Sequence, residues 1–164
     1  MRQGPNVKSS MNRVTKHEYP KQRVAARLRR LGLTVSAADP NLGYDMVVDG
    51  HVRVTLRVAF PSMRQHRVTV QGRQYRYRYQ SWHFNFHHHG EMRERYTDVF
   101  VCIAMPARGR SNAETFILPW GEIRGKTFSL HAGRRRYAGQ YAPMRDQWQL
   151  IEDAAHRAEL RAVA

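Results

Sequence analysis

The sequence GYDMVVDG (residues 43–50), followed by RVTLRVA (residues 53–59), decides the fold of this chain. Both stretches are rich in β-branched residues, and the Asp49-Gly50 dipeptide between them is typical of a tight hairpin turn. We therefore expect two strands, over residues 44–48 and 52–60, paired as a hairpin. A short strand over residues 34–37 is expected just before them.

A helix is expected upstream of this hairpin. Val24 and Leu28 recur at helical spacing, and Gly32 is placed to cap a C-terminus. The pattern predicts a helix over about residues 18–31, with Pro20 in its first turn.

Downstream, the chain is expected to form short strands and a final helix. The apolar run over residues 98–104 predicts a buried central strand. Pro143 is expected to open the final helix, in which Trp148, Ile151 and Ala155 form an apolar stripe with Ala158. Shorter strands are expected over residues 114–118 and 127–130, with one helical turn at residues 119–123.

Aromatic and basic residues alternate between residues 73 and 86. Tyr75, Tyr77 and Tyr79 alternate with Arg76 and Arg78, so each run predicts a strand with aromatic rings on one face and charges on the other. A second run alternates Trp82, Phe84 and Phe86 with polar residues. We expect the tyrosines to cover the sheet or its edge, and base stacking on them requires that they be exposed.

The charge balance favours a polyanionic partner. The chain has 164 residues, with 28 Lys and Arg against 13 Asp and Glu, for a net charge of +15. This size fits one domain, expected over residues 18–164, and the polar residues 1–17 predict a flexible basic arm. Such a field attracts nucleic acid first and an anionic membrane second.

From the cysteine and hydropathy patterns we expect a cytoplasmic protein. Cys102 is the single cysteine, so neither an intrachain disulfide nor a cysteine-based zinc site is expected. The first ten residues lack an apolar run, and no stretch has eighteen apolar residues, so we expect no signal peptide and no membrane span.

The order of helix, strands and closing helix resembles the restriction-endonuclease-like fold of the PD-(D/E)XK superfamily. In that family a strand bearing Asp leads through a hairpin to a strand bearing Asp, Glu or Gln, one spacer residue, and Lys. Asp45 fits the first acidic position. The segments YTDVFVC (residues 96–102), FILP (116–119), Ile123, Tyr137 and MRDQW (144–148) are similar to those of a group of small uncharacterised members.

The resemblance covers roughly residues 18–151 and implies an α/β (α+β) core, with a mixed central β-sheet flanked by an N-terminal and a C-terminal helix. It also implies a metal-dependent endonuclease site in which Asp45 binds Mg²⁺. The chain departs from the family at the other positions: Thr55 replaces the second carboxylate, Arg57 replaces Lys, and Gln22 stands near the place of a helix Glu. Because neutral ligands offset the dehydration of Mg²⁺ poorly, and because Arg and Lys differ in shape, the site is expected to be degenerate.

We therefore expect a double-stranded-DNA-binding protein with a nuclease-like fold that does not cut, in which Arg57 pairs with Asp45. Two alternatives remain open: an active Mg²⁺-dependent endonuclease that uses Asp45 with Glu18 or Gln22, and an RNA- or ribosome-associated basic module. Action as a homodimer is also left open.

Candidate phosphate contacts lie outside the nuclease-like site. They are Arg73, Arg76 and Arg78 in the alternating strand, and Arg134, Arg135 and Arg136 in a later basic loop. The His87-His88-His89 tract is interpreted as a solvated strand end, since consecutive strand residues alternate faces and cannot easily converge on one metal. Asp98 is assigned to capping or ion pairing.

Overall fold

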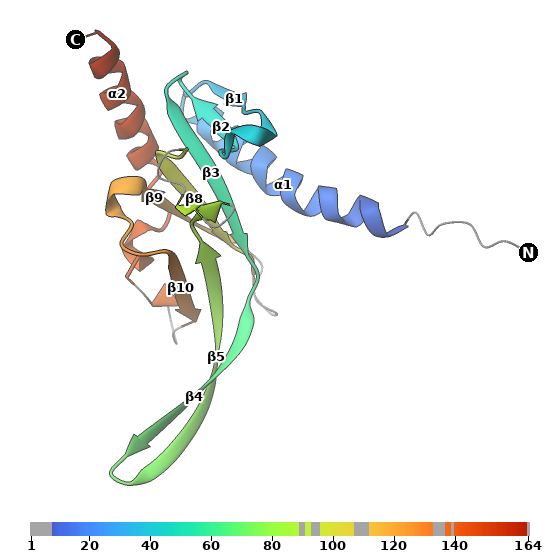
Figure 1. Ribbon diagram of the computed structural model, residues 1–164, viewed down its shortest axis with the longest axis vertical. Helices are drawn as coiled ribbons and strands as arrows, with labels where there is room; N and C mark the ends of the chain where they lie inside the picture. Colours follow the sequence, from blue (N-terminus) through green and yellow to red (C-terminus); the bar gives the residue numbers. More distant parts are fainter. Residues whose placement is uncertain are drawn as a thin grey trace, which may run out of the picture.

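The central feature of the fold is a five-stranded mixed sheet with helices on one face and a second, antiparallel sheet on the other (Figure 1). The computed structural model describes residues 8–88, 91–92, 96–106, 112–132, 137–138 and 140–163. The helices are α1 (Lys8–Arg30) and α2 (Gln149–Val163). The first sheet has the order β1 (Val35–Ala37), β2 (Met46–Val48), β3 (Val52–Ala59), β8 (Val99–Ala104), β9 (Glu114–Pro119). The second has the order β11 (Tyr137–Ala138), β10 (Thr127–Ala132), β5 (Arg73–Asn85), β4 (Ser62–Val70), and β6 (His87–His88) pairs with β7 (Glu91–Met92).

The first sheet is mixed because β3 and β8 run parallel while its other pairs are antiparallel. The expected β2–β3 hairpin is confirmed. Asp49 and Gly50 both have positive φ, at 48° and 72°, which is the conformation that a tight hairpin turn requires. The Asp49 carboxylate also accepts hydrogen bonds from the backbone N–H and the hydroxyl of Thr34, and so ties β1 to the turn.

Side-chain alternation on β3 and β8 divides the core into two layers. On one face Val54, Leu56 and Val101 pack with Val24 and Leu28 of α1, as the helical spacing predicts. The same layer includes Ile151 and Ala155 of α2, with Trp148 and Ala158 partly buried against it. On the other face, β3 and β8 contribute Ala59, Phe100, Cys102 and Ala104, which pack against the aromatic residues of the second sheet, Trp82, Phe84, Phe86 and Phe128.

The second sheet extends into a long hairpin formed by β4 and the first part of β5. It projects away from the rest of the protein, at the opposite end from α2 (Figure 1). Gln71 and Gly72 turn the chain with positive φ at both positions, and nine residue pairs follow in register from Val70↔Arg73 to Ser62↔Ser81. Residues 62–67 and 73–78 are exposed.

The structure differs from the sequence-based prediction in several elements. Helix α1 begins at Lys8, so part of the expected arm is helical, and Pro20 lies inside the helix instead of in its first turn. Pro143 lies in a short 3-10 turn (Ala142–Met144), and α2 begins only at Gln149. The two expected aromatic strands form one strand, β5, and β4 was not predicted at all. Within the described residues, neither helix combines the length and the apolarity needed to cross a membrane.

The two faces of β5 predict a contrast in stability. Trp82 is fully buried and its indole N–H donates to the Met105 carbonyl at 2.8 Å, whereas Tyr77 is 49% exposed. We expect Trp82→Ala to lower the free energy of unfolding by about 3–5 kcal/mol and Tyr77→Ala by about 1 kcal/mol or less. Urea unfolding measures both, and equal losses would contradict the two-faced strand.

Candidate functional site

Asp45, the residue that fits the family's first acidic position, lies immediately before β2. Its backbone N–H donates to the Val54 carbonyl at 2.9 Å, which places it beside β3. Its Oδ2 accepts a hydrogen bond of 2.8 Å from the backbone N–H of Leu56, and its Oδ1 lies 3.0 Å from the Lys21 Nζ of α1. Both carboxylate oxygens are therefore already engaged by the protein.

Arg57, which the resemblance sets at the lysine position, lies on β3 and is half-buried. Its Nε donates to the Asn85 carbonyl at 2.7 Å and its NH1 to the Leu56 carbonyl at 3.3 Å. Burial lowers the pKa of Arg57, and attraction to Asp45 opposes that shift. The ion pair that the structure shows for Asp45 is with Lys21, so the expected direct pairing with Arg57 is replaced by a pairing with the helix.

Thr55, which the resemblance to the nuclease superfamily sets at the second carboxylate position, is fully buried. Its hydroxyl hydrogen-bonds with that of Thr97, and the Gly43 carbonyl lies 3.5 Å away. The surroundings are tight: Gly43 has a φ of +80°, and a Cβ there would come 3.1 Å from the Tyr96 ring. This position is filled by packed protein, with no space for a longer acidic side chain.

Two more candidates lie on α1. Gln22 is exposed, and the Glu18 side chain is 54% exposed, with its Oε1 3.9 Å from Lys21 Nζ. Lys21 therefore lies between the carboxylates of Glu18 and Asp45. Sequence reasoning weighed Glu18 and Gln22 but missed Lys21. The available signal was its position three residues after Glu18, which places the two on one flank of a helix.

The arrangement around Asp45 is a poor magnesium site. Mg²⁺ prefers near-octahedral oxygen ligation, and a lysine already neutralises Asp45. Among the residues that the structure describes, no group of three His, Cys, Asp or Glu is placed to hold a metal. What this arrangement does chemically is anchor α1 to the start of the β2–β3 hairpin through an ion pair.

Asp98 has a comparable anchoring role at the start of β8. Its Oδ1 lies 2.8 Å from Arg53 NH2, and its Oδ2 accepts from the Arg53 backbone N–H at 2.8 Å and from its Nε at 3.0 Å. Burial raises the pKa of Asp98, but these hydrogen bonds outweigh it, so the pKa lies below its ordinary value. These contacts join the N-terminal ends of the parallel strands β3 and β8. They agree with the ion-pairing role expected for Asp98.

The projecting hairpin carries the densest exposed positive charge of the described structure apart from α1. Residues 62–81 include Arg64, Arg67, Arg73, Arg76 and Arg78, and no acidic residue. The register places Arg67 directly opposite Arg76 and Gln65 opposite Arg78. We call Arg67, Arg76 and Arg78 the basic face. Because like charges opposite each other destabilise a strand pair, this face gains stability from an anionic partner.

The other face of the hairpin carries the tyrosines, as the alternation predicts. His66 pairs with Tyr77 across the strands, with ring centroids 5.4 Å apart, and Tyr77 and Tyr79 are 6.1 Å apart. Tyr75 and Tyr77 are about half exposed, at 51% and 49%. The tyrosines were expected to cover the sheet or its edge. Tyr75 and Tyr77 are instead half exposed, because the hairpin extends beyond the core.

A hydrogen-bonded cluster at the base of this tyrosine face orients the hairpin on the second sheet. Arg64 Nε donates to His83 Nε2 at 3.1 Å, while His83 Nδ1 lies 2.7 Å from the Ser129 hydroxyl. Since Nε2 accepts, the proton of the neutral ring is on Nδ1 and is donated to Ser129. Desolvation, then Arg64 and His131, lower the pKa of His83 and favour this neutral state.

The remaining candidates of the sequence analysis are the later basic loop and the histidine tract. Arg134, Arg135, Arg136 and His89 lie outside the described residues. His87 and His88 form β6, whose backbone pairs with β7.

Comparison with known proteins finds no matching family, no similar curated protein and no similar solved structure. A functional assignment therefore rests on the residues of this chain.

The packing at Thr55 predicts that a second carboxylate cannot be restored there at low cost. Thr55→Glu would place a charged, longer side chain against Thr97 and Gly43, and we expect it to lower the free energy of unfolding by at least about 3 kcal/mol. The matched control is Thr69→Glu on the exposed hairpin, with an expected change within about 0.5 kcal/mol. Denaturant unfolding that left Thr55→Glu as stable as Thr69→Glu would show that the position is open.

Proposed function

We propose that the protein binds double-stranded DNA through the β4–β5 hairpin, on a nuclease-like core that does not cut. The observation that carries the proposal is the exposed basic face, where Arg67 stands opposite Arg76 on a hairpin without acidic residues. Phosphate oxygens neutralise such a face and receive the fork of donors that each guanidinium presents.

The dimensions of the hairpin support a duplex as the partner. The major groove of DNA, ~12 Å wide, admits a two-stranded β-ribbon, whose strands lie ~4.8 Å apart. At ~3.4 Å per residue, the nine residues of β4 span ~31 Å, close to one turn of the duplex. Contacts from the basic face to phosphates would give affinity with little sequence preference.

The remainder of the molecule is consistent with this proposal. Helix α1 adds exposed arginines, including Arg23, Arg27 and Arg30, to the total charge of +15. Cys102 is the single cysteine of the sequence, so the fold is held without an intrachain disulfide, as in proteins of reducing compartments. We include a cytoplasmic location in the proposal on this basis.

Removal of the facing arginines tests the proposal. We expect Arg67→Ser with Arg76→Ser to weaken binding to duplexes of unrelated sequence alike, by at least about tenfold. The slope of log affinity against log salt concentration should become shallower by about 1.8, at roughly 0.9 for each phosphate neutralised. Fluorescence anisotropy of labelled duplexes at several salt concentrations measures both quantities.

The matched control is Arg157→Ser with Arg161→Ser, which removes the same charge from exposed positions on α2, at the other end of the molecule. We expect a much smaller loss, since only the long-range field changes. Equal losses in the two double variants would mean that the hairpin is not the interface. Affinity independent of salt would exclude phosphate binding altogether.

The second candidate function is a metal-dependent endonuclease with a migrated site. The position of Lys21 favours it, because an ammonium 3.0 Å from Asp45, with Glu18 nearby, supplies the charges that the family's chemistry uses. The occupied Asp45 carboxylate favours the non-cutting protein, since a metal would have to displace Lys21.

Incubation with DNA decides between the two candidates. We expect no cleavage of supercoiled plasmid by the unmodified protein with Mg²⁺ or Mn²⁺, because the described residues assemble only two carboxylates beside Lys21. Agarose gels detect nicking. Divalent-dependent cleavage that disappears in Asp45→Ala would overturn the non-cutting assignment in favour of the enzyme.

A further inference from the structure

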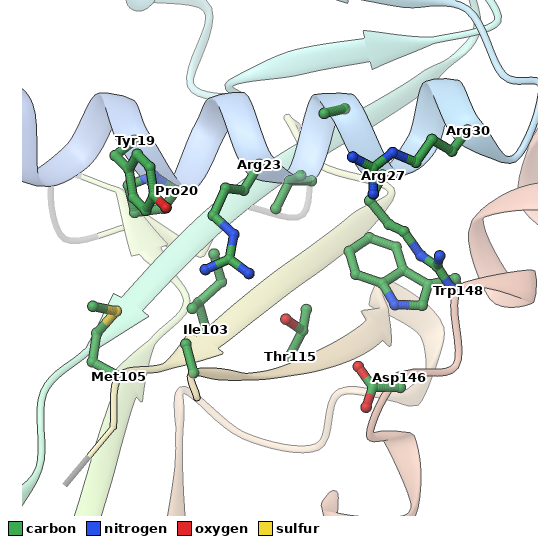
Figure 2. Close-up of a pocket in the computed structure, with 13 residues that line it drawn as sticks. Tyr19, Pro20, Arg23, Arg27, Arg30, Ile103, Met105, Thr115, Asp146 and Trp148 are labelled. Atoms are coloured by element: carbon green, nitrogen blue, oxygen red, sulfur yellow. The ribbon is translucent and has the colours of Figure 1, made fainter. Parts of the chain in front are cut away.

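A groove with a volume of about 620 Å³ lies along α1, away from both Asp45 and the hairpin (Figure 2). One wall is α1, with Tyr19, Arg23, Arg27 and Arg30, and the far side contains Asp146 and Trp148. At 3.6 residues per turn, these arginines and Lys21 lie on opposite flanks of the apolar stripe of α1. The groove is therefore separate from the site around Asp45.

The arginine wall is an ordered row of positive charge. Arg23, Arg27 and Arg30 occupy successive turns of α1, and the rise of 1.5 Å per residue spreads them over ~10 Å. All three are exposed, and within the described part of the chain none lies within ion-pair distance of a carboxylate. Figure 2 shows Arg23 and Arg27 pointing from the helix into the groove.

Aromatic surfaces border these charges. The Trp148 indole, which is half-buried, lines the same groove as Arg27 (Figure 2). At the other end of the row, the Arg23 guanidinium lies 5.8 Å from the centre of the Tyr19 ring, and Tyr19 is 62% exposed. A groove lined by both guanidinium groups and aromatic rings matches a ligand that carries both a phosphate and a flat base.

Asp146 narrows the choice of ligand. Its backbone N–H donates to the Thr115 carbonyl at 2.9 Å, and its φ of 54° holds it in the left-handed region. Its carboxylate repels a second anion on this side and offers an acceptor to a ribose hydroxyl or a base amino group. An acidic peptide would meet the arginines but gain nothing from the indole and would be repelled by Asp146.

We propose that this groove is a nucleotide-binding site: the arginines hold a phosphate and Trp148 stacks on the base. The volume lies in the range of small-molecule sites. The same chemistry is offered by a free nucleotide and by a nucleotide within a nucleic-acid strand. The site is independent of the hairpin proposed to hold the duplex.

Tryptophan fluorescence of the full chain tests the site. Trp82 is fully buried, whereas Trp120 and Trp148 are both half-buried. Of the three indoles only that of Trp148 lines the groove, so quenching that is lost in Trp148→Phe reports on this site. The protein is to be titrated separately with AMP, a 5′-phosphorylated single-stranded decanucleotide, inorganic phosphate and a polyglutamate peptide, while tryptophan fluorescence is measured. AMP and the decanucleotide should quench in a saturable manner, and the peptide should bind at least tenfold more weakly than either.

Variants assign the signal to the groove. Arg27→Gln and Arg23→Gln should each weaken nucleotide binding at least fivefold, whereas Arg157→Gln on α2 should not. Trp148→Phe should remove most of the quenching while calorimetry still detects binding. Urea unfolding of each variant, at the same midpoint as the unmodified protein, excludes a folding defect.

The experiment distinguishes a free nucleotide from a nucleotide within a strand as the ligand. It also distinguishes the groove proposal from the hairpin proposal. Binding of AMP alone identifies a free-nucleotide site, and binding of the decanucleotide without AMP identifies a site for a strand; both support the groove. Absence of saturable binding by either, equal affinity in Arg27→Gln, or tighter binding of polyglutamate overturns it. Arg67→Ser with Arg76→Ser should leave AMP binding unchanged, so failure of the hairpin proposal does not affect this result.

Discussion

The parallel pairing of β3 with β8 is the constraint on which the rest of the structure depends. Six residue pairs, from Val54↔Val99 to Ala59↔Ala104, join the strands. The Arg53–Asp98 ion pair holds their N-terminal ends together. Both strands are covered on both faces, which explains the continuous apolar sequence of β8. A parallel pair needs a crossover, because a tight turn can join only antiparallel strands.

The crossover in this protein is built from strands. The chain leaves β3, forms β4 and β5, passes through the short strands β6 and β7, and only then returns to β8. The C-terminal part of β5 covers the sheet with Trp82 and Phe84, while its N-terminal part pairs with β4 beyond the core. The exposed hairpin is therefore an extension of the layer that closes the core, and its base is fixed by the Arg64, His83 and Ser129 cluster.

How far the sequence predicted these elements depends on whether one of their faces is buried. The β2–β3 hairpin, the apolar strand β8 and the stripe of α2 all leave a pattern, because burial selects apolar residues at fixed spacing. β4 has exposed residues on both faces over most of its length, so no alternation marks it. Only its partner and the Gln71-Gly72 turn specify it.

The sequence of β5 also contains a signal for the exposure of its tyrosines, in the positions of its aromatic residues. The tyrosines occupy odd positions up to Tyr79, whereas the next aromatics occupy even positions from Trp82 onward. In one continuous strand, a change of parity moves the rings to the opposite face. The tyrosines could therefore not share the buried face with Trp82 and Phe84, and their exposure follows from the sequence once β5 is known to be unbroken.

The site around Asp45 was predicted less completely because its partner comes from a distant element. The hairpin placed Asp45 beside β3 correctly, and Thr55 and Arg57 lie on that strand. Lys21 is brought to Asp45 only by the packing of Val24 and Leu28 on the sheet, which is tertiary information. A local pattern that identifies each strand does not specify which helical flank meets it.

The same packing explains why one helix can take part in two different surfaces. Because the apolar stripe of α1 lies against the sheet, residues on its two flanks emerge on opposite sides of the contact. Lys21 on one flank neutralises a carboxylate of the fold, so its charge is used internally. Arg23, Arg27 and Arg30 on the other flank have no such partner among the described carboxylates, and the groove beside them leaves their charge available to a ligand. The helix orientation that pairs Lys21 with Asp45 is thus the one that exposes Arg23, Arg27 and Arg30 to the groove.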